Sequence, residues 1–305
     1  MGICDGRVVI VTGAGRGIGR EHALAFAAEG AKVVVNDLGA GLDGSNVGES
    51  PAEQVVAEIK AVGGDAVVNG NDISSWEGAR ELVQQAIDTF GGLDVLVNNA
   101  GFLRDKMLVG MGEQDWDNVI NVHLKGHFAP LRHAAEYWRA ESKAGRPRQA
   151  RVINTSSGAG LFGSVGQGNY ATAKAGIALL TIQTAAEMKG YGVTANAIAP
   201  AARTRMTTSA GEGMASQMAA PEDGSFDVMD PANISPLVVW LGSEESGDVS
   251  GRVFEVEGGK VTVCDGWQRA ASEDKGAKWD PAELGSVVPR LVSESPTPVP
   301  VYGAR

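Results

Sequence analysis

The chain has 305 residues, 43% of them hydrophobic and 21% charged, which suits one large globular domain or two small ones. With 26 basic and 37 acidic residues the formal net charge is −11, so no global positive field exists to gather nucleic acid or an anionic membrane. Two cysteines far apart in sequence exclude a disulfide framework, and no apolar run is long enough to span a bilayer; we expect a soluble cytoplasmic protein.

Apolar runs of strand length alternate with longer helical segments along most of the chain. The runs that predict strands are residues 7–12, 31–37, 65–72, 93–99, 150–157, 193–200 and 251–259. The segments that predict helices are residues 20–30, 51–62, 74–90, 113–139, 170–189 and 231–241, with Gly30, Gly63 and Gly190 expected as left-handed caps. This alternation predicts an α/β fold, a doubly wound parallel sheet of about seven strands with helices on both faces.

Three stretches interrupt the alternation. Residues 38–50 are glycine-rich and predict a surface loop. Residues 201–230 predict a mobile substrate flap whose adaptable apolar contacts come from Met206, Met214, Met218 and Met229. We expect one domain over 1–266 and a C-terminal extension over 267–305, with a short helix that starts near Asp280 and is interrupted by Pro289. Whether that extension covers the domain, a neighbouring subunit or nothing is left open.

The first strand runs into a glycine-rich loop, TGAGRGIG, at residues 12–19. Glycines let the backbone approach a pyrophosphate, and the start of the following helix offers free N–H groups and a partial positive charge. The spacing departs from GxGxxG because Ile18 stands where the third glycine would fall, and a strand-to-helix turn without a ligand is the alternative. We expect cofactor contacts from Gly13, Arg16, Gly17, Ile18 and Gly19.

The second strand ends in Asp37, whose carboxylate could accept hydrogen bonds from both ribose hydroxyls of NAD. Arg16 could instead bind the 2′-phosphate of NADP. Asp37 would repel that phosphate, so we expect a preference for NAD(H), with Asp72 near the adenine. The alternative for Asp37 is a solvated turn residue.

Tyr170 and Lys174 stand four residues apart, on one face of a predicted helix. Bringing a tyrosine from its usual pKa of about 10 to near neutrality takes about 4 kcal/mol, and we expect the Lys174 ammonium and an oxidised nicotinamide to supply it. The phenolate could then take the proton of an alcohol, while Ser157, at the end of the fifth strand, donates to the same oxygen. Such a pair alone could be a surface pair, but the glycine loop and Ser157 argue for catalysis.

Five motifs in order, TGAGRGIG, NNAG (98–101), Asn121, Ser157 and YATAK (170–174), resemble the short-chain dehydrogenase/reductase family over about residues 6 to 260. The resemblance implies a Rossmann-type NAD-binding domain and a catalytic tetrad of Asn121, Ser157, Tyr170 and Lys174. The family spacing between serine and tyrosine selects Ser157 over Ser156. Asn121 would anchor a water in a proton relay; the alternative is a backbone bond within its helix.

The same resemblance implies the rest of the cofactor site. Its expected members are Asn99, Ala100, Gly101, Tyr170, Lys174, Pro200 and Thr204. Many family members carry Pro-Gly after the sixth strand, whereas this chain has Pro200 and Ala201. No metal is expected, because His123 and His127 form a pair without a clear third ligand.

A narrower likeness lies in VVVNDLG, NNAGFLRDKML and IAPAARTRMT, which look like the dehydrogenase module of peroxisomal multifunctional enzyme type 2, also called 17β-hydroxysteroid dehydrogenase type 4. That likeness implies oxidation of a (3R)-hydroxyacyl-CoA, steroid-CoA esters included, to the 3-ketoacyl-CoA with NAD. Arg203 and Arg205 would meet CoA phosphates or be solvated flap charges. The alternatives are a dehydrogenase of free hydroxysteroids or other bulky alcohols and, from another class, an NAD(H) sensor without catalysis. We expect a homo-oligomer, dimer or tetramer, that contacts itself through helices 113–139 and 170–189.

Overall fold

Eight strands form one sheet in the order β3-β2-β1-β4-β5-β6-β7-β8, and all neighbours are parallel except β7 and β8. The computed structural model describes residues 2–39, 50–208, 216, 218–264 and 266–304. The strands are β1 Val8–Thr12, β2 Lys32–Asn36, β3 Asp65–Asn69, β4 Val95–Asn98, β5 Ala150–Thr155, β6 Val193–Ala201, β7 Val253–Glu257 and β8 Lys260–Cys264. The predicted α/β doubly wound fold is confirmed.

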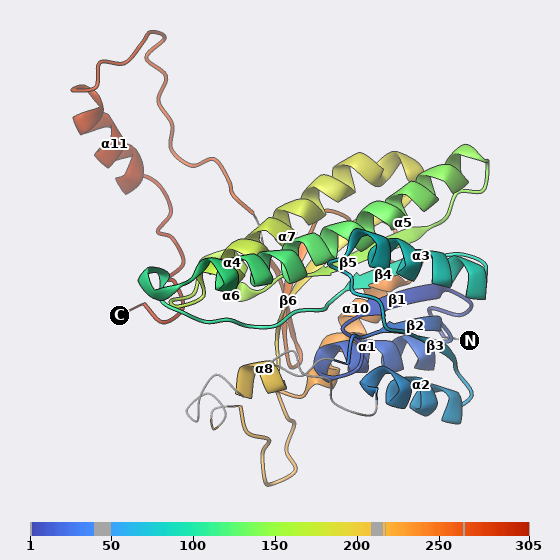
Figure 1. Ribbon diagram of the computed structural model, residues 1–305. Helices are drawn as coiled ribbons and strands as arrows, with labels where there is room; N and C mark the ends of the chain where they lie inside the picture. The colour runs from blue at the N-terminus through green and yellow to red at the C-terminus, as the bar shows by residue number, and fades with distance from the viewer. Residues whose placement is uncertain (1, 40–49, 209–215, 217, 265, 305) are drawn as a thin grey trace.

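Helices cover both faces of this sheet (Figure 1). They are α1 Gly17–Ala28, α2 Pro51–Ala61, α3 Trp76–Phe90, α4 Glu113–Ile120, α5 Gly126–Lys143, α6 Gly158–Phe162, α7 Gly168–Met188, α8 Arg205–Thr208, α10 Ser235–Gly242 and α11 Leu284–Ser293. Helices α1, α2 and α10 pack on one face, and α3, α5 and α7 pack on the other. Val and Ile fill the central strands because both of their faces are buried against helices.

Several predicted boundaries were wrong, each for a local reason. The predicted helix over 113–139 is divided by a π-helical segment, Asn121–Lys125, between α4 and α5. Gly190 does not cap α7, because a 3-10 turn follows and Gly192, with φ of 79°, ends it in the left-handed region. Strand β8 was missed because it is a short, half-exposed partner of β7. Pro289 lies inside α11 and does not interrupt it.

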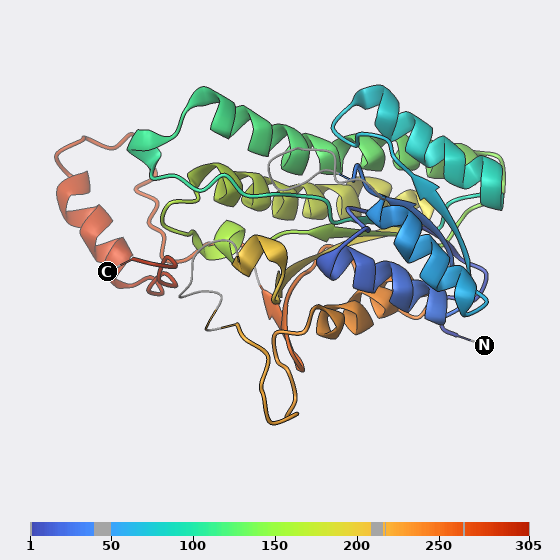
Figure 2. The same ribbon diagram turned by 60° about the horizontal axis from the view of Figure 1, so that its bottom comes forward.

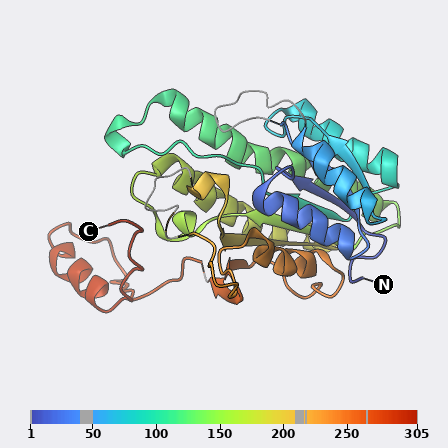
Figure 3. The same ribbon diagram turned by 90° about the horizontal axis from the view of Figure 1, so that it is seen from below.

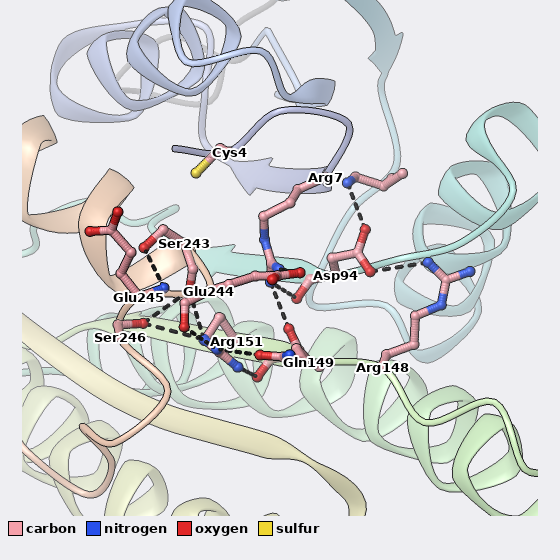
Figure 4. A network of polar contacts seen from close by, with 12 residues as sticks. Cys4, Arg7, Asp94, Arg148, Gln149, Arg151, Ser243, Glu244, Glu245 and Ser246 are labelled. Carbon is pink, nitrogen blue, oxygen red and sulfur yellow. Dashed lines mark hydrogen bonds and ion pairs between the residues drawn. The ribbon is translucent and has the colours of Figure 1, made fainter. Parts of the chain in front are cut away.

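The edge where the central strands begin is closed by a buried polar network (Figure 4). Arg151 of β5 is 2% exposed and donates to the carbonyl oxygens of Ser243 and Glu244, at 2.9 and 3.1 Å. Asp94 accepts from the Val8 N–H at 2.9 Å and from Arg148 at 3.0 Å. Because these groups satisfy one another, this edge is a structural anchor, and the opposite edge, where the strands end, is left for the site.

The flap and the extension are the least regular parts of the chain. Met218 and Met229 are half-buried, whereas Met214, the side chain of Met206 and residues 40–49 of the predicted loop lie outside the described residues.

The two ends of the described chain lie on opposite sides of the molecule (Figure 3). Within the described ranges, no helix has both the length and the apolar character needed to cross a membrane.

Candidate active site

The glycine loop lies between the end of β1 and the start of α1. Gly13 and Gly17 have φ of 63° and 54°, and a Cβ on Gly13 would come within 2.7 Å of the Ala100 Cα. Helix α1 has neither a side-chain cap at Arg16 nor an acidic residue in its first turn. Its first N–H groups are therefore open to an anionic ligand, and Ile18, whose side chain packs on the core, would take part through its backbone.

The segment after β4 braces this loop. Asn99 Nδ2 donates to the carbonyl oxygens of Thr12 and Gly13, at 3.0 and 3.2 Å. Thr12 Oγ1 accepts from the N–H groups of Asn99 and Ala100, at 2.9 and 3.2 Å. A Cβ on Gly19 would clash with the Gly13 carbonyl, so this glycine is needed for close packing between the loop and α1. The structure thus brings the NNAG and TGAGRGIG segments together.

Asp37 faces the same loop. Its Oδ2 accepts from the Gly15 N–H at 2.9 Å, and its Oδ1 accepts from the Gly39 N–H at 2.8 Å. Each oxygen keeps a second acceptor site, so the carboxylate can both hold the loop and bind ribose hydroxyls. Asp72 is exposed, and its Oδ1 accepts from the N–H and hydroxyl of Ser74, at 2.8 and 2.7 Å, at the turn before α3.

The far side of the loop is formed by the residues after β6. A Cβ on Gly17 would lie 3.5 Å from the Thr204 Cγ2, and Pro200, in β6, pairs with Val256. An anion-binding helix start, a carboxylate at the end of β2 and the Thr204 side chain opposite the loop match the parts of a nicotinamide dinucleotide. The described residues therefore fit that cofactor.

Ser157, Tyr170 and Lys174 meet where β5 ends. Ser157 caps α6, its Oγ accepts from the Ala159 N–H at 3.2 Å, and it is hydrogen-bonded to the Tyr170 side chain. Ser156 is buried and donates to the Lys174 carbonyl at 2.8 Å, so it holds the backbone of α7. The geometry agrees with the choice of Ser157 over Ser156.

Lys174 is 2% exposed, and its Nζ lies 5.5 Å from the Tyr170 ring centroid. Its Nζ donates to the Thr155 carbonyl at 2.6 Å. Burial lowers the pKa of Lys174 to about 7, because a buried ammonium loses its hydration. The Lys174 ammonium is thus fixed in position, and it gives up its proton at a lower pH than an ordinary lysine does.

The described side chains alone do not bring the pKa of Tyr170 toward neutrality. Burial raises the pKa of Tyr170, and the hydrogen bond to Ser157 opposes that rise without cancelling it. A further positive charge beside Tyr170 is therefore needed to bring its pKa toward neutrality.

Asn121 is not part of this cluster, which corrects the tetrad expected from the sequence. Its side chain is exposed at the start of the π-helical segment. The side chain of that segment that faces the site is His123, 1% exposed, whose ring lies 5.2 Å from that of Tyr170 at an interplanar angle of 88°. One residue step of the helix turns a side chain by about 100°, so two positions separate a buried face from an exposed one.

His123 also fixes the loop after β4. Its Nε2 lies 2.7 Å from the Phe102 carbonyl oxygen, whereas its buried Nδ1 has no hydrogen-bond partner among the described residues. Burial, and then the charge of Lys174, lowers the pKa of His123 to about 3, so the ring is neutral at physiological pH. A Cβ on Gly101 would clash with this ring, which explains the last glycine of NNAG.

The sequence does contain a signal for His123. Val119, His123 and His127 follow one another at four-residue spacing, and all three are buried, so this spacing marks the inner face of the helix.

The two arginines of the flap differ. Arg203 forms an ion pair with Asp227 and donates to the Met218 carbonyl at 2.8 Å, so it is engaged within the flap. Arg205 is exposed. Across the described ranges, no three His, Cys, Asp or Glu side chains stand together in a way that could hold a metal ion.

Comparisons with known proteins identify the family of the chain. A family model described as short chain dehydrogenase matches residues 7–215. Hydroxyacyl-CoA dehydrogenase ChsB1 of Mycobacterium tuberculosis is 45% identical, over 92% of this chain and 86% of that protein. Peroxisomal multifunctional enzyme type 2 of mouse is 43% identical over 84% of this chain, which spans 32% of that longer enzyme. A crystal structure of a short chain dehydrogenase from Mycobacterium avium is 61% identical, covers 99% of this chain and 100% of its own, and superposes with a TM-score of 0.89. The chain belongs to the short-chain dehydrogenase family and is an oxidoreductase that acts on CH–OH groups.

Proposed function

We propose that this protein oxidises a (3R)-hydroxyacyl-CoA, steroid-bearing CoA esters included, to the 3-ketoacyl-CoA with NAD as the cofactor. The observation that carries the proposal is the cluster of Ser157, Tyr170 and buried Lys174 beside the glycine loop. The substrate class is supported by the names of the two relatives above, which are a hydroxyacyl-CoA dehydrogenase and a peroxisomal multifunctional enzyme.

Each residue of the cluster has a separate task. The Ser157 hydroxyl, held at the start of α6, positions the substrate oxygen through a hydrogen bond. The Tyr170 phenolate takes the hydroxyl proton, and the Lys174 ammonium, fixed by the Thr155 carbonyl, stabilises that phenolate. When bound, the oxidised dinucleotide would accept the hydride from the carbon that bears this hydroxyl. Neutral His123, bonded to the backbone of Phe102, keeps the loop after β4 against Tyr170.

The preference for NAD over NADP rests on Asp37. Its carboxylate is fixed by the Gly15 and Gly39 N–H groups and cannot swing away from a 2′-phosphate without breaking both bonds. The negative charge of the Asp37 carboxylate would repel the negative 2′-phosphate of NADP. Arg16, at the start of α1, is the residue that would permit NADP, and a comparable kcat/KM for the two cofactors would overturn the preference.

The test is a panel of 3-hydroxyacyl-CoA esters and steroid alcohols with NAD, followed by the absorbance of the reduced cofactor. We expect turnover of the CoA esters. Rapid oxidation of a free hydroxysteroid without turnover of any acyl-CoA would favour the alternative substrate. The sensor alternative predicts cofactor binding with no turnover of any alcohol in the panel.

A tyrosine exchange separates enzyme from sensor more sharply. Tyr170→Phe removes only the phenolic oxygen, and we expect near-complete loss of turnover while NAD binding is kept. Tyr191→Phe is the matched control, because this tyrosine packs on the core after α7, and both properties should stay near wild type. Equal activity of Tyr170→Phe and the control would contradict the assigned role.

We also propose a homo-oligomer formed through α4, α5 and α7. Phe128, Leu179 and Ile182 are exposed apolar side chains on α5 and α7. Some of them line a groove of about 400 Å³ formed by Leu124, Phe128, Gly176, Leu179, Leu180 and Gln183. Sedimentation of the wild type and of Leu179→Glu tests this, since a charge in a buried interface should dissociate the subunits. Neither Cys4 nor Cys264 forms a disulfide, which supports a reducing compartment such as the cytoplasm.

A further inference from the structure

The C-terminal extension leaves the domain after β8 and returns to it. Helix α11 stands apart from the body, whereas the last described residues come back toward α6 (Figure 2). The returning segment pairs with the chain that follows α6, as a parallel bridge between Ser164 and Tyr302. The Tyr302 N–H donates to the Gly163 carbonyl at 3.2 Å, and the Val165 N–H donates to the Tyr302 carbonyl at 2.9 Å. Backbone bonds thus fix the end of the chain in place.

This attachment brings an aromatic ring next to the catalytic serine. The Tyr302 and Phe162 rings meet edge to face, with centroids 6.3 Å apart and an interplanar angle of 90°. A Cβ on Gly158 would lie 2.9 Å from the Tyr302 hydroxyl oxygen, and Gly158 directly follows Ser157. The absence of a side chain at Gly158 therefore leaves the space that the ring of Tyr302 occupies.

The ring is only partly covered by these contacts. Tyr302 is 48% exposed, and Val165, beside it, is 47% exposed. On the other side of the same loop, Met107 is 60% exposed, and its sulfur lies 3.9 Å from where a Cβ on Gly166 would stand. Three exposed side chains from distant parts of the sequence, Tyr302, Val165 and Met107, thus lie along the loop that follows α6. Exposed apolar side chains that gather on one loop, unlike ones that stand singly, mark a surface that can contact another molecule.

The charges nearby indicate what kind of group this surface accepts. Burial raises the pKa of the Tyr302 phenol, and the negative charges of Glu255 and Glu257 on β7 raise it further. Carboxylates in that position would repel the phosphates of CoA. An uncharged, apolar part of a substrate is not repelled by these carboxylates and can lie beside Tyr302.

We propose that Tyr302, with Phe162 and Val165, forms the outer wall of the substrate site and selects substrates by the bulky apolar group that extends beyond the reacting carbon. The inference rests on the proposed function, because it takes that group to be the acyl or ring part of a hydroxyacyl-CoA. Tyr302 is a specificity-determining residue and takes no part in proton transfer.

Tyr302→Ala in the full chain tests this through a ratio. The quantity is kcat/KM for a steroid-bearing or long-chain 3-hydroxyacyl-CoA divided by kcat/KM for 3-hydroxybutyryl-CoA. We expect the ratio to fall about tenfold, chiefly through KM of the bulky ester, because a half-exposed ring offers contact to the large substrate only. Tyr302→Phe keeps the ring and should keep the ratio. Val292→Ala, an exposed apolar exchange on α11, is the control and should also keep it.

Two outcomes would overturn the proposal. One is an unchanged ratio in Tyr302→Ala, and the other is an equal loss for both esters, which would mean that the tail only supports the catalytic residues. If the wild type oxidises no acyl-CoA, the proposed function fails, and the same ratio is then measured on a bulky and a small secondary alcohol that it does oxidise.

Hydrogen–deuterium exchange gives a readout besides activity. We expect the long-chain 3-ketoacyl-CoA, but not acetoacetyl-CoA, to slow exchange of the amides of Val165 and Tyr302, which bond the tail to the loop after α6. Equal protection by both esters, or by neither, would contradict contact between the tail and the bulky group.

Discussion

Lys174→Met should stabilise the fold at neutral pH while it abolishes turnover. The folded-state pKa of about 7 lies about 3.5 pH units below the 10.5 of an ordinary lysine, so keeping this ammonium buried and charged costs up to about 5 kcal/mol, or about 4 kcal/mol at pH 7. Methionine carries no charge but leaves the Thr155 carbonyl without its donor, at a cost of about 1–3 kcal/mol. The net expectation at pH 7 is a gain of about 1–3 kcal/mol in the free energy of unfolding.

The pH dependence identifies the cause of that gain. The native state binds fewer protons than the unfolded state between pH 7 and 10.5, so the contribution of Lys174 to stability is complete above pH 10.5 and is lost as pH falls toward 7. The advantage of Lys174→Met should therefore shrink by about 3 kcal/mol between pH 7 and 9.5, most steeply between pH 8 and 9, at about 1.3 kcal/mol per pH unit.

Urea unfolding of both proteins at pH 7 and 9.5, at one protein concentration, measures this difference. Lys189→Met, the same exchange on an exposed lysine just after α7, is the control and should show no such pH dependence. If Lys174→Met is less stable than the wild type by the same amount at both pH values, the lysine is not strained by burial and the reasoning is refuted.

Four further exchanges test the site and the core. His123→Leu should lower kcat/KM at least about tenfold because the bond to the Phe102 carbonyl is lost, whereas Asn121→Ala should stay within about twofold of wild type; the reverse order in steady-state assays would restore the sequence-based tetrad. Asp37→Ser should lower the NAD-to-NADP ratio of kcat/KM at least about tenfold, and an unchanged ratio would show that the carboxylate does not select the cofactor. Burial lowers the pKa of His22 to about 3, so its contribution to stability is complete above pH 6.5 and is lost as pH falls toward 3. Between pH 7 and 5 the wild type should lose about 2 kcal/mol more stability than His22→Gln, and parallel urea midpoints over that range would contradict this.

The order of strands and helices could be predicted from the sequence because parallel strands buried on both faces must be rich in Val and Ile. The ends of elements were less certain. Polar residues such as Asp72 and Ser157 continue the apolar runs in sequence, but they leave the sheet to form turns and caps. Strand β8 depends on pairing with β7 at one edge, and such pairing leaves little trace in a five-residue run.

The sequence by itself determined the fold class, the family and the residue types of the site, because the glycine loop and the order Ser157, Tyr170, Lys174 depend on local spacing along strands and helices. Only the tertiary structure decided which face of the interrupted helix meets Tyr170. The π-helical segment adds a residue to one turn, and His123 rather than Asn121 became buried. It also decided where the extension goes: the contact of Tyr302 with Gly158 joins residues 144 positions apart, and no local pattern encodes a contact of that kind.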